Sequence, residues 1–265
     1  MQTPVNPFKQ ALRQRQPRIG LWLGMASTIA TEICAGAGFD WLMLDGEHTP
    51  NDMRSMLAQL QTIAGYACQP VCRVPVGETA LIKQYLDLGM PNLLVPMVDT
   101  PQQAAALVQA CRYPPQGIRG MGTARASRWG RYTRYAQEAN DQVCLLVQVE
   151  TRLALANLDA IAAVEGIDGI FIGPSDLSAS LGHAGNATHP DVQAAIEDAF
   201  ARTLRAGKAP GILTGDTALA ERYLALGATF VAVGIDTQIL LRGCDALLAR
   251  FKPPAGTATA TKPHG

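Results

Sequence analysis

Several features that define whole classes of protein are missing from this chain of 265 residues. No apolar run is long enough to cross a bilayer, and the first residues lack the apolar core of a secretory signal. The 22 basic side chains are balanced by 22 acidic ones, so there is no basic surplus for binding nucleic acid. We therefore expect a cytoplasmic protein that binds neither a membrane nor nucleic acid.

Cysteine pairs and well-placed lysines are also absent. None of the six cysteines belongs to a CxxC pair, which argues against a structural zinc site and indicates small buried side chains in a reducing compartment. The five lysines all stand away from the carboxyl ends of predicted strands: Lys9, Lys83, Lys208, Lys252 and Lys262. A Schiff-base aldolase needs a lysine in its site, so that mechanism is disfavoured.

What the chain does contain is a regular alternation of short apolar runs and helical patterns. Eight runs are predicted strands: 19–24, 40–45, 70–75, 92–98, 143–150, 169–174, 209–213 and 230–234. Continuously apolar strands suit a parallel sheet buried on both faces, and eight strand–helix units predict a (β/α)8 TIM barrel. A doubly wound sheet is the second choice, but no GxGxxG follows the first strand. We predict a single domain over 1–252 and a disordered tail over 253–265.

Polar residues collect where the predicted strands end. In a TIM barrel these carboxyl ends form the active-site mouth. Residues at or just beyond the ends are Trp22, Asp45, Glu47, His48, Arg73, Gln148, Glu150, Ser175, Asp176, Leu213 and Gly234. If the barrel is correct, these residues meet at one mouth.

Glu150 and Asp176 follow neighbouring strands. Two carboxylates without a nearby cysteine fit a hard divalent cation such as Mg²⁺ or Mn²⁺. Each could instead cap a helix, and Asp176 in GPSDLS stands where a cap is expected. As a pair they favour a metal. The backbone amides of Ser175 and Asp176 could hold a substrate carboxylate, although GPSD taken alone indicates a plain tight turn.

His48 is the candidate base, because it follows two acids at a strand end and imidazole titrates near neutrality. A histidine in a loop is more often merely solvated, and that description serves for His183, His189 and His264.

Arg73 lies within a predicted strand and needs a polar partner if it is buried. Asp45 or Glu47 could provide it, with or without a catalytic role. Asp87 reads from its spacing as a surface acid paired with Lys83, four residues earlier on the same helix.

The segment 113–135 is a long irregular connection that carries Met121, Trp129 and five arginines. It could be a solvated basic loop. Long connections are usually functional, and exposed aromatic and arginine side chains favour contacts, so we expect an interface that reaches a neighbouring subunit.

The motifs IGLWLG, AGAGFDWLMLDGEH, LLVPMV, YPPQGIRG, ARASRW, LVQVET, GIFIGPSDLS and FVAVGIDT resemble, in number and order, the HpcH/HpaI aldolase family. The resemblance runs from about Phe8 to Phe251. It implies a reversible class II aldolase that cleaves 4-hydroxy-2-oxo acids to pyruvate and an aldehyde through a metal-stabilised enolate, in a homohexamer. Sugar-acid aldolases and malyl- or citramalyl-CoA lyases use the same chemistry, and a non-catalytic module that binds a metal–keto acid complex is a further alternative.

The resemblance also implies roles for individual residues. It assigns a Mg²⁺, Mn²⁺ or Co²⁺ ion to Glu150 and Asp176, the base to His48, an acid that raises its basicity to Asp87, and transition-state stabilisation to Arg73. The positions matching keto-acid contacts are Gln148, Ser175 and Asp176. For the remote end of the substrate we expect an apolar wall that includes Trp22 and Leu213, so that many aldehydes are accepted.

Overall fold

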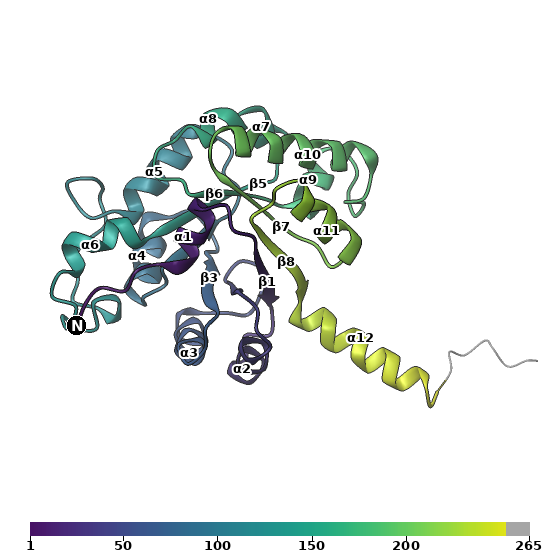
Figure 1. Ribbon diagram of the computed structural model, residues 1–265, viewed down its shortest axis with the longest axis horizontal. Coiled ribbons are helices and arrows are strands. Elements are labelled where there is room, and N and C mark those ends of the chain that lie inside the picture. Colours follow the sequence, from purple (N-terminus) through teal and green to yellow (C-terminus); the bar gives the residue numbers. More distant parts are fainter. Residues whose placement is uncertain (253–265) are drawn as a thin grey trace, which may run out of the picture.

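The computed structural model describes residues 1–252, so the predicted tail lies outside the described part of the chain. Eight parallel strands form a closed barrel in chain order, as predicted (Figure 1). The strands are β1 (Arg18–Leu23), β2 (Trp41–Asp45), β3 (Gln69–Arg73), β4 (Asn92–Val95), β5 (Cys144–Val149), β6 (Gly169–Ile172), β7 (Ala209–Leu213) and β8 (Phe230–Ile235).

Most of the helices return the chain from one strand to the next along the outside of the barrel. They are α2 (Thr28–Gly36), α3 (Met53–Ile63), α4 (Thr79–Asp87), α5 (Pro101–Cys111), α6 (Tyr135–Gln142), α7 (Arg152–Ala156), α8 (Leu158–Ala162), α9 (Pro174–Ser180), α10 (Pro190–Arg205) and α11 (Thr217–Ala225). The long connection 113–135 holds only a short 3₁₀ turn, η1 (Arg125–Ser127).

Large aromatic side chains fill the interior of the barrel where glycines make room. A Cβ atom on Gly20 would lie 2.2 Å from the Trp41 ring, and one on Gly211 would lie 2.2 Å from the Phe230 ring. Both rings are fully buried. The barrel is therefore a packed core and not a pore.

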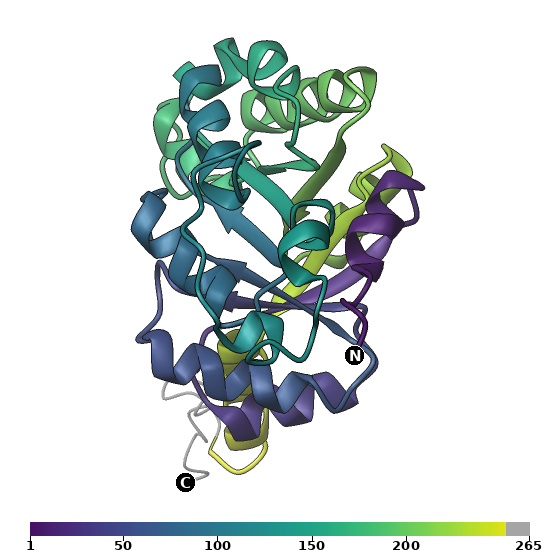
Figure 2. The ribbon, with the colours of Figure 1, turned by 90° about the vertical axis from the view of Figure 1, so that its left-hand side faces the viewer.

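A first helix, α1 (Pro7–Arg13), was not expected from the sequence. Its Phe8 and Leu12 are buried against Trp41 and the rest of the interior cluster, and Phe8 packs edge-on to Phe230 at 6.2 Å. In Figure 2, α1 and α6 lie on the side facing the viewer. Because the amino end of the barrel is closed in this way, chemistry is left to the carboxyl end.

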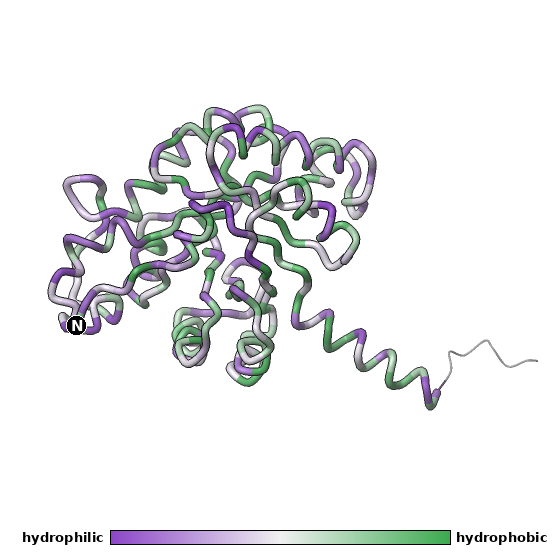
Figure 3. Tube along the Cα trace, in the orientation of Figure 1, coloured by the Kyte–Doolittle hydropathy of each residue, from purple (hydrophilic) through white to green (hydrophobic). Residues whose placement is uncertain are grey.

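The last helix, α12 (Asp236–Ala249), projects away from the barrel (Figure 1). Large apolar side chains along it are more than half exposed: Ile239, Leu240, Leu241, Leu247 and Leu248. Figure 3 shows these apolar stretches alternating with polar ones along the helix. Among residues 1–252, no helix is long and apolar enough to cross a membrane.

Candidate active site at the barrel mouth

Strand alternation gathers the polar residues at the carboxyl end of the barrel. Side chains two residues apart share a face, and Met43 and Val71 point into the interior. Asp45 and Arg73, the next inward positions on β2 and β3, are paired in register. They therefore stand at the top of the inward rows, where the apolar core ends.

A cavity of about 320 Å³ opens there. Its walls include Trp22, Asp45, His48, Arg73, Gln148, Phe171, Ser175, Asp176, Leu213, Ile235 and Thr237. Most of the residues predicted from strand ends are thus brought together in a single site.

Asp45 organises one side of this cavity. Its carboxylate accepts hydrogen bonds from Arg73 Nε (2.8 Å) and Nη2 (2.5 Å) and from Trp22 Nε1 (3.1 Å). It also accepts the backbone N–H of Glu47 at 2.9 Å. Burial would raise the pKa of Asp45, but the bonds and charge of Arg73 outweigh it, and the net pKa is lowered. Asp45 is therefore a permanent anion that fixes Arg73.

Arg73 is held by three partners in all. Besides Asp45, its Nη1 lies 2.9 Å from Glu47 Oε2, and its guanidinium carbon lies 4.9 Å from the centroid of the Trp22 ring. The guanidinium is buried at the base of the cavity. It provides a fixed positive charge where a substrate would sit. Glu47 is itself mostly buried, and this burial raises its pKa although Arg73 is close.

His48 is the least constrained of the predicted residues. Its side chain is 66% exposed, and its Nε2 lies 3.8 Å from Glu47 Oε2, beyond a hydrogen bond. The ring is carried by a loop whose backbone is tied to Asp45, through Thr49 Oγ1 (2.5 Å) and Asn51 Nδ2 (2.8 Å) donating to the Asp45 carbonyl. Its backbone is fixed while its ring is free to approach a ligand in the cavity.

Glu150 occupies the opposite side of the mouth in a very different setting. It is only 1% exposed, and its oxygens accept hydrogen bonds from the Met97 amide (2.9 Å) and the Gln148 side-chain amide. Burial raises its pKa to about 7, and the negative charges of Asp176 and Glu47 act in the same direction. The ionised form therefore lacks a compensating positive charge.

Gly173 lets Glu150 reach the end of β6. A Cβ atom at this position would lie 2.2 Å from Glu150 Oε2 and 2.9 Å from Gln148 Nε2. The glycine is also the N-cap of α9, which has no side-chain cap, so Asp176 does not cap this helix. The sequence reading did not single out Gly173, although GIFIGPSD marks the turn.

The donor set on this side fits a hard divalent cation. Glu150 is buried with amide donors alone, Asp176 is near enough to raise its pKa, and Gln148 Oε1 is buried without a hydrogen-bond partner in the described residues. All of these ligand atoms are oxygens, the type that Mg²⁺ and Mn²⁺ prefer. A bound cation would stabilise the ionised form of Glu150.

Asp87 lies away from the mouth. It ends α4, the helix that returns the chain to the start of β4, and its carboxylate accepts from Arg119 Nη2 at 2.8 Å. The expected partner, Lys83, is replaced by this buried arginine, because 113–135 folds back onto α4. Within one chain the structure does not bring Asp87 to His48.

Comparisons with known proteins identify the family of this chain. The family model described as HpcH/HpaI aldolase/citrate lyase matches residues 18–242. The chain is 64% identical over 262 residues to a hydroxypyruvate/pyruvate aldolase of Deinococcus radiodurans, covering 98% of this chain and 95% of that one. It is 57% identical over 260 residues to a 4-hydroxy-2-oxo-heptane-1,7-dioate aldolase of Shigella sonnei, covering 97% and 98%.

A solved structure of an HpcH/HpaI aldolase/citrate lyase family protein from Burkholderia cenocepacia superposes with a TM-score of 0.90 at 42% identity, covering 93% of this chain and 99% of that one.

Proposed function

Since this chain belongs to the HpcH/HpaI aldolase/citrate lyase family, we propose that it cleaves 4-hydroxy-2-oxo acids such as 4-hydroxy-2-oxoheptanedioate to pyruvate and an aldehyde, here succinic semialdehyde. The chain is an aldolase and therefore a carbon–carbon lyase. One observation carries the choice of substrate class: the fixed guanidinium of Arg73 and the carboxylate of Asp176 line one small cavity, and Glu150 is buried beside Gln148 of the same cavity wall. This arrangement suits a 2-oxo acid that must gain negative charge at its keto oxygen.

The family is typically dependent on a divalent metal. In this chain Glu150 and Asp176 would hold the ion, and Mg²⁺, Mn²⁺ or Co²⁺ fits the oxygen donors. When bound, it would act as a Lewis acid toward the 2-oxo acid.

The chain's own side chains perform the remaining steps. His48 takes the proton of the C4 hydroxyl, the C3–C4 bond breaks, and C4 leaves as the aldehyde. The electron pair of that bond forms the C2–C3 double bond, and the carbonyl pair moves to the C2 oxygen, where the guanidinium of Arg73 stabilises the developing charge. Gln148 and the α9 amides of Ser175 and Asp176 position the acid end. The proton that His48 took is then returned to C3, the C2 carbonyl re-forms, and pyruvate is released.

The test of this proposal is pyruvate release from 4-hydroxy-2-oxoheptanedioate by enzyme stripped of metal and then reloaded. We expect no turnover in chelator and recovery with Mg²⁺, Mn²⁺ or Co²⁺. Full turnover in chelator would contradict the metal role. Sugar-acid and malyl- or citramalyl-CoA substrates in the same panel decide between related lyase activities.

His48→Ala should lower the cleavage rate by ~10²–10⁴-fold, which is the usual contribution of a general base. Metal affinity should remain nearly unchanged, because His48 is not a proposed ligand. A variant that cleaves at the normal rate would assign the base to another group.

A second donor is favoured by the relative from D. radiodurans, whose name pairs hydroxypyruvate with pyruvate. The two acids share the carboxylate and keto oxygens and differ by one hydroxyl. In the synthetic direction we expect both to be used as donors. The comparison of kcat/KM for the two, with one aldehyde, measures the preference.

The acceptor end is bounded by Trp22, Leu213 and Ile235, which offer mainly apolar area. Arg119 is buried and paired with Asp87, so within one chain it does not bind the distal carboxylate of an aldehyde such as succinic semialdehyde. Apolar walls discriminate weakly, by ~1–3 kcal/mol per methylene, and we therefore propose broad aldehyde tolerance. A preference of ~10⁴-fold for succinic semialdehyde over a neutral aldehyde of equal length would contradict this.

We also propose that the enzyme is a homo-oligomer, with a hexamer as the expected state. The exposed apolar residues of α12 lack a covering surface among residues 1–252, and Met121 and Trp129 in the 113–135 segment are 69% and 61% exposed. Only a second copy could bring Asp87 to a His48 ring. Light scattering tests this, and a monomer would count against it.

A further inference from the structure

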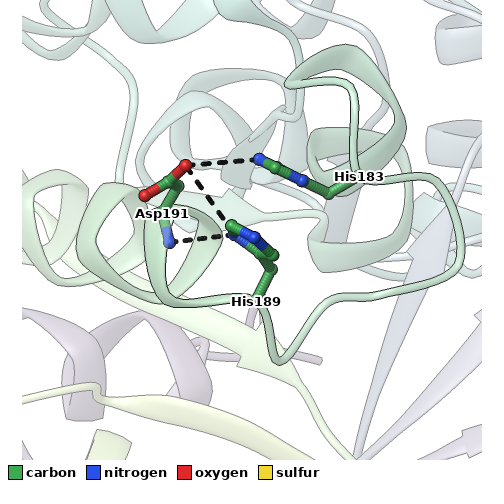
Figure 4. Close-up of side chains that lie close together, drawn as sticks. All are labelled: His183, His189 and Asp191. Carbon is green, nitrogen blue, oxygen red and sulfur yellow. Dashed lines mark hydrogen bonds and ion pairs between the residues drawn. The ribbon is translucent and has the colours of Figure 1, made fainter.

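A second group of potential metal ligands lies outside the mouth, in the connection between α9 and α10 and the first turn of α10. His183, His189 and Asp191 point toward one another there (Figure 4). Among residues 1–252 they form the one group of three such residues whose ligand atoms all lie within 4.8 Å of one another. The aldolase chemistry proposed above does not use them.

One distance within the group is close to that between two ligands of the same ion. Asp191 Oδ2 lies 3.4 Å from His183 Nε2 and 3.8 Å from His189 Nδ1. Two ligands at ~2.0–2.1 Å from a tetrahedral zinc stand about 3.3–3.4 Å apart. The contacts are too long for good hydrogen bonds, and all three ligand atoms lie within 4.8 Å of one another, so movements of the side chains alone could bring them onto one ion.

The loop that carries the group is held in place by other bonds. The His183 amide donates to the Ser178 carbonyl at 2.7 Å, and Gln193 Nε2 donates to the Ala187 carbonyl at 2.8 Å. The imidazole rings are stacked with their centroids 3.6 Å apart and 14° between planes. Because an ion lies in the plane of each imidazole that binds it, one ring must turn out of this stack before both nitrogens reach one ion. The backbone that carries the ligands is ordered before any ion arrives, which lowers the entropic cost of binding.

We propose that His183, His189 and Asp191 bind one borderline divalent ion, for which Zn²⁺ is the natural candidate. Two imidazoles and a carboxylate suit zinc, nickel or cobalt, in contrast to the all-oxygen set at the mouth. The ion would link the α9–α10 connection to the first turn of α10. This inference does not depend on the reaction catalysed at the mouth.

Two features of α10 work against a cation, and Asp191 offsets the first of them. The amino end of a helix is partly positive, and the carboxylate of Asp191 offsets that charge. His189 Nδ1 also accepts the Asp191 backbone N–H at 3.2 Å as the N-cap. An ion on Nδ1 would replace this bond, leaving an exposed amide to water.

The test uses Zn²⁺ alone and measures binding by equilibrium dialysis. The parent chain carries Glu150→Gln and Asp176→Asn, which removes the proposed ligands at the mouth. It should bind one Zn²⁺ per chain and gain thermal stability. Adding His183→Asn and His189→Asn should weaken this affinity at least ~100-fold, since loss of even an outer-sphere partner costs 10–100-fold.

Asparagine is chosen because it is itself a good N-cap. If the cluster only caps α10, the asparagine variants should bind Zn²⁺ as the parent does, and the proposal is overturned. His264→Asn in the same parent is the control for histidine number and should bind normally. The thermal unfolding midpoint without Zn²⁺ should be the same in parent and variants, which shows that lost binding does not come from lost folding. Absence of Zn²⁺ binding by the parent at micromolar concentration also overturns the proposal.

Discussion

Asp45 and Glu150 are two buried carboxylates at one barrel mouth, and they differ in almost every physical respect. Asp45 is saturated with donors, two of them from a guanidinium, and its pKa is lowered. Glu150 has amide donors only, and burial raises its pKa to about 7. Equal burial thus produces one completed ion pair and one carboxylate without a positive partner, and the proposed cation would complete the second site.

The largest expected effect comes from breaking the completed pair. In Asp45→Asn, the new NH2 group must face an N–H donor of Arg73 or Trp22, where the carboxylate had an accepting oxygen. The charge of Arg73 also loses its main partner. Removal of one member of a buried pair costs about 3–5 kcal/mol. Urea unfolding of the metal-free variant at pH 8 measures the loss. A change below ~1 kcal/mol would mean that Glu47 alone compensates Arg73.

The matching change at Glu150 should raise the free energy of unfolding, whereas Asp45→Asn lowers it. A carboxyl whose folded pKa is about 7, against 4.5 normally, stabilises the fold below pH 4.5, and this contribution is lost as the pH rises through 7. Glu150→Gln keeps the shape without the charge. In metal-free protein at pH 8 it should gain up to ~3 kcal/mol, from 1.36 kcal/mol per pKa unit.

At pH 4.5 this gain should disappear, because Glu150 is then protonated in the parent as well. The comparison is between unfolding free energies of the two proteins at both pH values. A Glu150→Gln variant that is less stable than the parent at pH 8 would show that another group already balances the charge.

The contrast between the two carboxylates was only partly foreseeable from the sequence. Apolar runs predicted eight strands, and alternation along them places Asp45, Arg73 and Gln148 inward, so the composition of the mouth follows from local pattern. Strand ends also identified Glu150 and Asp176. Their role as metal ligands stays a prediction.

What the sequence could not provide were contacts between distant segments. Seven residues of α1 carry too little pattern to reveal that Phe8 closes the barrel. The partner of Asp87 is Arg119, 32 positions away. The apolar face of α12 predicts burial, but the partner surface is absent from the local pattern.

Metal affinity should depend on pH through Glu150 and not through Asp45. Because the metal-free pKa of Glu150 is about 7, binding must displace a proton below that pH. The dissociation constant for Mn²⁺ should rise roughly tenfold per pH unit below 7 and level off above it. Calorimetric titration across this range measures it. A flat profile would place the ion elsewhere.

The smallest expected effect concerns the ring that contacts both members of the Asp45–Arg73 pair. Trp22 donates one hydrogen bond to Asp45 and stacks over Arg73. Trp22→Phe keeps an aromatic face and removes the donor, so the loss should be about 0.5–1.5 kcal/mol in stability, the net contribution of one hydrogen bond. If Asp45 fixes Arg73 mainly through the arginine bonds, kcat should fall less than tenfold, because the guanidinium stays in place. Leu213→Ala, on the same wall without any bond to Asp45, is the control for lost apolar area and should act on the KM of the aldehyde. A drop in kcat of tenfold or more would show that Trp22, and not the ion pair alone, holds the guanidinium in position.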